Sequence, residues 1–224
     1  YYAIINGVNK RGEKMINWVY VVILGLAVGF LSAMFDWPFV VSISIILVFA
    51  LCSIGYMFYI AYASTNFAKI RKYIVKHKKD PVMNYIHTLE VGTKEQEIEA
   101  MEKIIAHYKQ PVIKNTYEMN RAIRLDDFER AQYYADQLMD NQNGPYGKAL
   151  IAAVAGNREE ANSYSLKSEW MKYGIEAQLA LTERNLEAFD HFARQSVEAA
   201  KGLQRYSLYY SFKKAKLEFE MESK

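Results

Sequence analysis

Residues 170–188, WMKYGIEAQLALTERNLEA, carry the pattern that decides the fold. In this stretch Tyr173-Gly174 precedes Glu187-Ala188, and fourteen residues separate the glycine from the alanine. The same arrangement stands 27 residues earlier, where Tyr146-Gly147 precedes Glu160-Ala161 at the same spacing. A pattern that recurs at a fixed interval is typical of repeat proteins, in which each repeat is one small group of packed elements.

The repeat continues toward the amino terminus. Four alanines, each after acidic or polar residues, recur at intervals of 31, 30 and 27 residues: Ala100, Ala131, Ala161 and Ala188. No stretch after Asp80 alternates polar and apolar residues as strands do, and the apolar spacing is helical throughout. Small residues let two helices cross closely, and polar turns such as Leu125-Asp126-Asp127 and Gly156-Asn157 can join them. One such hairpin cannot bury its apolar face alone, so the sequence predicts a stack of helical hairpins.

These features resemble the tetratricopeptide repeat family. The Trp170-x-x-Tyr173-Gly174 element is similar to the family's Trp-x-x-Leu-Gly, and Pro111 and Pro145 lie near where the family places a proline. The intervals are shorter than the family's 34 residues, and the first two units lack the glycine, so the repeats are degenerate. We expect an all-α domain over residues 80–224, with hairpins from about Pro81 to Ala200 and a capping helix over Leu203–Ser223. An irregular helical bundle with coincidental alanines is the alternative.

The resemblance also implies a binding surface. In tetratricopeptide proteins the side chains of the first helices line a concave face that binds a protein or peptide. Four residues of the second unit are the candidates that the resemblance implies: Tyr117, Asn120, Arg121 and Arg124. The two arginines could pair with an acidic partner, since guanidinium groups bind carboxylates in a bidentate manner. Ordinary helix-surface residues are the alternative for each of them.

Two apolar runs without charge precede the repeats. Residues 16–35 and 39–63 reach roughly 30 and 37 Å as helices, against a hydrocarbon core of about 30 Å. The Asp36-Trp37-Pro38 connection is short, so residues 15–63 are predicted to form a two-helix transmembrane hairpin. A buried helix pair of a soluble protein is less consistent with the sequence, because such helices normally have a charged outer face.

A basic segment over residues 64–79 follows the second run. It contains six cations and no acidic residue: Lys69, Arg71, Lys72, Lys76, Lys78 and Lys79. The positive-inside rule then places both termini in the cytoplasm. We expect the second span to continue as a helix through this segment until Asp80-Pro81 breaks it. The cations could bind anionic lipid headgroups or serve only as a topology signal.

The first residues lack any periodicity. Residues 1–14 precede Met15, and Arg11-Gly12-Glu13 can be encoded by a purine-rich stretch like a bacterial ribosome-binding site. We therefore expect residues 1–14 to be a flank that is not native, and the protein to be a multi-pass protein of a bacterial cytoplasmic membrane.

Small residues form a stripe in the first span. Gly25, Gly29 and Ala33 lie four residues apart, which permits close approach of another helix. Packing against the second span is one interpretation, and homo-oligomerisation or docking onto another membrane protein is the other. Neither span contains an ionisable residue, which argues against transport by this chain alone.

Signatures of catalysis are lacking in the sequence. The single cysteine, Cys52, excludes an internal disulfide or a cysteine-cluster metal site, and the four histidines have no ligand spacing. Glu95, Glu97, Glu99 and Glu102 are interpreted as one solvated helix face. Residues 80–224 hold 19 basic and 23 acidic residues, which opposes nucleic-acid binding. We expect no enzyme, no cofactor and no metal.

The predicted function is that of a membrane-anchored cytoplasmic adaptor or scaffold that binds a protein or peptide through its helical array. The alternative is an accessory subunit of a transport, secretion or envelope-synthesis complex that docks through its transmembrane hairpin.

Overall fold

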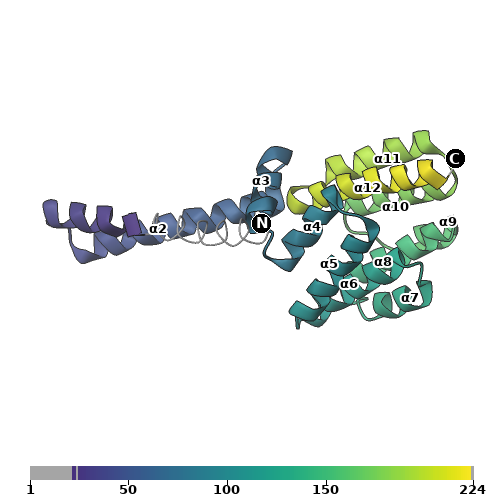
Figure 1. Cartoon of the computed structure of the whole chain (residues 1–224), viewed down its shortest axis with the longest axis horizontal. Coiled ribbons are helices and arrows are strands. Elements are labelled where there is room, and N and C mark those ends of the chain that lie inside the picture. The colour runs from purple at the N-terminus through teal and green to yellow at the C-terminus, as the bar shows by residue number, and fades with distance from the viewer. Residues whose placement is uncertain (1–21, 24, 223–224) are drawn as a thin grey trace, which may run out of the picture. The chain divides into compact units, whose positions relative to one another are not determined.

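The computed structural model describes residues 22–23 and 25–222. The described residues form an all-α fold without a strand, as the sequence predicts (Figure 1). The chain divides into two compact units, residues 1–58 and 59–224. The expected flank over residues 1–14 lies outside the described residues, and so does part of the first expected span.

The first unit contains two apolar helices. A short helix, Gly25–Met34, is followed by a turn in which the Trp37 amide donates to the Ser32 carbonyl at 3.1 Å, and then by α2 (Phe39–Phe58). Among the described helices, one is long and apolar enough to cross a membrane, the 25-residue helix Phe39–Ala63. The structure therefore supports one candidate span, with the bounds expected for the second apolar run, and does not show a hairpin of two spans.

The second unit begins with η1 (Tyr59–Ala63), a π-helical turn, and α3 (Phe67–His77). The expected continuous helix through residues 64–79 is wrong, because the chain leaves the helix at Ser64. The Ser64 carbonyl accepts a hydrogen bond from the Gly202 amide at 2.8 Å, and the Asn66 side chain caps α3 through the Lys69 amide at 3.0 Å. The break expected at Asp80-Pro81 is confirmed.

Four helical hairpins follow. In each hairpin the first helix packs against the second. The pairs are α4 (Pro81–Val91) with α5 (Lys94–His107), α6 (Pro111–Arg124) with α7 (Phe128–Asp136), α8 (Asn143–Val154) with α9 (Arg158–Ser163), and α10 (Glu169–Thr182) with α11 (Leu186–Ala199). The first helices α6, α8 and α10 also pack side by side. The hairpins thus begin and end where the sequence predicts the array, and tetratricopeptide geometry itself stays a prediction.

The last three hairpins share one turn. A residue with positive φ follows each first helix: Asp126 at 59°, Gly156 at 75° and Arg184 at 60°. The next residue, Asp127, Asn157 or Asn185, donates its amide to a carbonyl five residues earlier and caps the second helix with its side chain. Short polar side chains satisfy the free amides at a helix start. The recurrence of this turn is direct structural evidence of internal repetition.

Small residues occupy the crossing points. Ala100, Ala131 and Ala161 are buried in their second helices, and Ala188 is partly buried. At Gly147 an added Cβ would collide with the Met119 side chain of α6, so the glycine allows α8 to approach. The alanines and glycines of the sequence repeat therefore mark close helix contacts.

The final helix, α12 (Gly202–Glu222), has nearly the predicted bounds and a wider role than a cap. It packs against α11, and also against η1, α3 and α4 at the start of the unit (Figure 1). Its first half carries the buried side chains Tyr206 and Leu208, and Tyr206 packs in a cluster with Ile60, Ile70 and Ile86. The helix therefore links the end of the array to its beginning.

Candidate functional site

The first helices of the array, together with α5 and α12, line an open cavity of about 310 Å³. Side chains from α4, α6, α8 and α10 face it, among them Leu89, Asn120, Leu150 and Gln178. Lys214 and Glu218 line it from α12. We call this space the inner cavity. Asn120 and Arg124, two of the residues that the resemblance implies for partner binding, line it.

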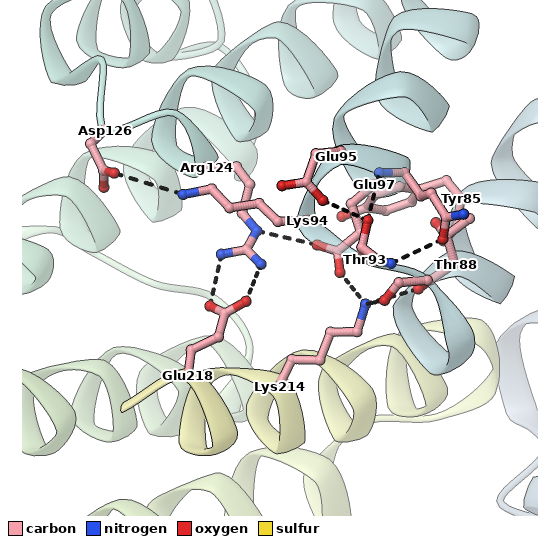
Figure 2. Close-up of polar contacts among 12 residues, drawn as sticks. Tyr85, Thr88, Thr93, Lys94, Glu95, Glu97, Arg124, Asp126, Lys214 and Glu218 are labelled. Atoms are coloured by element: carbon pink, nitrogen blue, oxygen red, sulfur yellow. Dashed lines mark hydrogen bonds and ion pairs between the residues drawn. The ribbon is translucent and has the colours of Figure 1, made fainter. Parts of the chain in front are cut away.

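Four charged side chains form the centre of this site (Figure 2). Arg124 of α6 donates from its two terminal nitrogens to both carboxylate oxygens of Glu218, at 2.9 and 2.5 Å. Its Nε donates to Glu97 at 3.2 Å, and Glu97 also accepts from Lys214. Because the Arg124 fork holds its carboxylate, the pKa of Glu218 lies below its ordinary value and that of Arg124 above it. We call these four residues the central ion cluster.

Local structure explains the position of each cluster member. Arg124 is the last residue of α6, directly before the shared turn. Glu97 follows the Thr93 capping box in the first turn of α5, where a negative charge complements the helix dipole. The Lys214 ammonium donates to the Thr88 and Gly92 carbonyls at 2.9 and 2.7 Å, at the carboxyl end of α4. Lys214 therefore satisfies the Gly92 carbonyl beyond the helix end and is a second donor to the Thr88 carbonyl, which also accepts from the Gly92 amide at 2.8 Å.

The four residues proposed for partner binding separate into two groups. Arg124 and Asn120 line the inner cavity. Tyr117 is partly buried and packs edge to face on Tyr85, with ring centroids 5.4 Å apart. Arg121 pairs instead with Glu102 of α5 at 2.8 Å. The structure thus brings Arg124 and Asn120 together and leaves Arg121 in a different contact.

One interpretation from the sequence is wrong. Glu97 belongs to the acidic run expected as a solvated face, yet its side chain is only 5% exposed. Glu95, Glu99 and Glu102 are exposed as expected. The helical register alone does not reveal the difference, because the cations that bind Glu97 are 27 and 117 residues away in sequence.

The six cations of the basic segment are exposed at the start of the second unit. Arg71 among them donates to Glu90 of α4 at 2.7 Å, and Glu90 also accepts from the Tyr206 hydroxyl at 2.7 Å. Arg71 therefore helps to join α3, α4 and α12. A role of the six cations in headgroup binding stays a prediction.

The small-residue stripe lies open along its described length. A Cβ added at Gly25 or Gly29 would have no described atom within 4 Å, and Ala33 is exposed. In residues 22–23 and 25–222, no group of three histidine, cysteine, aspartate or glutamate side chains could hold a metal ion.

Comparison with protein families, with curated proteins and with solved structures gives no match to this chain.

Proposed function

We propose that this protein is a membrane-anchored adaptor that binds a protein partner in its inner cavity, with Arg124 holding a carboxylate of that partner. The observation that carries the proposal is the Arg124 fork, which already binds a helical carboxylate, that of Glu218, in bidentate geometry. Such charge-assisted pairs combine strength with directional specificity. The site therefore selects an acidic side chain presented on a helix.

In this proposal a membrane anchor determines where in the cell the adaptor lies. The helix Phe39–Ala63 is the candidate span, and the proposal includes a second span over residues 16–35 in a bacterial cytoplasmic membrane. Because the exposed cations of residues 64–79 follow the helix directly, the positive-inside rule favours a cytoplasmic array and cytoplasmic termini. The proposed role is binding, without catalysis.

The second half of α12 acts as an internal competitor in this scheme. Residues 213–221 include no fully buried side chain, and Leu217 and Met221 are exposed. Lys214, Lys216 and Glu218 of this half form ion pairs with side chains of other helices. A partner helix with a comparable acidic side chain can displace this half while Tyr206 keeps the first half in place.

The test is a crosslinking pull-down from native membranes with paired variants. Arg124→Lys keeps the charge but loses the planar fork, so partner recovery is expected to fall about tenfold. Glu218→Gln weakens the internal competitor, so recovery of the same partner is expected to rise. Arg121→Lys is the matched control and is expected to change nothing, because Arg121 does not line the inner cavity.

The alternative, an accessory subunit that docks through its membrane helix, is favoured by the open stripe at Gly25 and Gly29. The double variant Gly25→Leu/Gly29→Leu tests it in the same experiment. Loss of the partner in this variant alone, with unchanged recovery for Arg124→Lys and Glu218→Gln, would contradict the adaptor.

A further inference from the structure

A second surface, separate from the inner cavity, lies between α11 and α12. It is a groove of about 540 Å³ with an apolar floor. Phe189, Ala193 and Val197 form a stripe along α11 at intervals of four residues, and Tyr209 and Phe212 line the groove from α12. Phe67 of α3 closes one end. None of the four residues of the central ion cluster lines it.

The rim of this groove is cationic. Four basic side chains and two acidic ones line the groove: Arg194, Arg205, Lys213, Lys216, Asp190 and Glu198. Lys216 is paired with Asp190 at 2.6 Å. Within the described part of the chain, no ion pair engages Arg194 or Lys213, and both are exposed. The rim thus keeps positive charge that the fold does not neutralise.

Arg205 adds a polar group to the apolar end. Its guanidinium carbon lies 5.7 Å from the centre of the Phe67 ring, and its Nη1 donates to the Glu198 carbonyl at 3.2 Å. Its Nε is shielded from solvent and has no hydrogen-bond partner among the described residues. Arg205 therefore adds a positive charge to this end of the groove, where its hydrogen bonds go to backbone carbonyls and not to a carboxylate of the described residues.

The order of the array indicates what shape fits the groove. After each of the first helices α6, α8 and α10, a second helix packs alongside. No described helix follows α12, and the groove between α11 and α12 is lined by the four-residue stripe of α11 and by Tyr209 and Phe212 of α12. Helices bind such grooves through apolar side chains at positions i, i+4 and i+7.

We propose that the groove between α11 and α12 is a docking site for an amphipathic helix of another protein, with an apolar face against Val197 and Tyr209 and acidic side chains beside Arg194 and Lys213. The apolar floor supplies affinity, and the cationic rim selects acidic helices and sets their register.

The test uses the full chain in detergent and a display library of 18-residue helical peptides. Binders are selected on the unaltered chain, and their affinities are then measured by fluorescence anisotropy on the variant Arg194→Glu/Lys213→Glu. The matched control is Lys109→Glu/Lys167→Glu, which changes the net charge equally at two exposed lysines outside the groove. Enriched peptides are expected to be acidic and apolar at four-residue spacing, with about tenfold weaker binding to the rim variant only.

A second variant separates the groove from surface charge in general. Ala193→Trp fills the apolar floor without changing charge and is expected to abolish binding, while circular dichroism checks that the fold persists. The proposal is overturned if no acidic helix is enriched, if the control variant loses affinity equally, or if Ala193→Trp still binds. Rim-dependent binding of phosphatidylglycerol vesicles in place of peptides would also overturn it and assign the groove to lipid.

Discussion

Replacement of Glu97 by glutamine is the most direct probe of the central ion cluster. The change keeps the size of the side chain and removes the charge between Lys214 and Arg124, whose side chains are 19% and 24% exposed. Loss of one partner from a buried pair costs about 3–5 kcal/mol. Lys214 retains two carbonyls and Arg124 retains Glu218, so we expect a loss of about 2–3 kcal/mol in the free energy of unfolding.

Glu99→Gln is the matched control, since Glu99 lies on the same helix. Glu99 pairs with Lys103, and both side chains are more than half exposed. The expected loss in the free energy of unfolding is therefore below about 0.5 kcal/mol. For a unit of this size, 1 kcal/mol corresponds to about 2–4 °C in Tm. Glu97→Gln is thus expected to lower Tm by about 4–12 °C and Glu99→Gln by about 2 °C or less.

The assay follows the fluorescence of Trp170 during heating of the full chain in detergent. Trp170 lies in α10 and packs on Tyr146, with ring centroids 5.3 Å apart, so its fluorescence changes when the helical array unfolds. The chain has three tryptophans, and the substitutions Trp18→Phe and Trp37→Phe remove the other two, so that the signal comes from Trp170 alone. Equal Tm values for the two glutamine variants would refute the reasoning, because they would show that the buried cluster contributes no more than a surface pair.

The remaining predictions concern the second half of α12 and its first residue. Arg124 lowers the pKa of Glu218, so the carboxylate takes up its proton at a lower pH in the folded protein than in the unfolded chain. The contribution of this ion pair to the stability of the fold is therefore present above about pH 4.3 and is lost as the pH falls through the pKa of the folded state. The protection of residues 213–222 from hydrogen exchange, relative to the intrinsic exchange rate at each pH, should therefore fall below about pH 4, ahead of that of residues 203–209, and the Glu218→Gln variant should lack this pH response. Gly202→Ala should destabilise the protein by more than about 3 kcal/mol, because φ is +58° and the new Cβ would collide with the Ala61 carbonyl. Gly156→Ala has a similar φ of +75°, but its new Cβ would meet only an ordinary contact with the Thr182 side chain at 3.6 Å. A loss of about 1–2 kcal/mol is therefore expected in the same thermal assay, and equal losses would refute the collision.

Local features of the sequence predicted the helices and their breaks. Asp80-Pro81 marks the start of α4, since the Asp80 carboxylate caps the Val82 and Met83 amides and proline fits the first helical turn. The recurrent alanines lie at the hairpin crossings, and the uncharged run over residues 39–63 forms the candidate span. Such signals act within a few residues, so the sequence displays them directly.

Two local expectations failed for the same reason. The helix that was expected to continue from the apolar run through residues 64–79 breaks at Ser64. The Ser64 carbonyl accepts a hydrogen bond from the amide of Gly202, which lies far along the chain. Glu97 is buried because α12 brings Lys214 against it across 117 residues. In each case a partner distant in sequence decided the outcome, and no local pattern reports such a partner.

The sequence by itself therefore determined which segments are helical, where the hairpins turn and which run is apolar enough to enter a membrane. The tertiary structure alone decided that α12 returns to the start of the array, lines the inner cavity and presents Glu218 to Arg124. The physical reason is the distance along the sequence over which each kind of interaction acts. Helix spacing and caps depend on neighbours within one or two turns, whereas the burial of a charge depends on which distant side chains neutralise it.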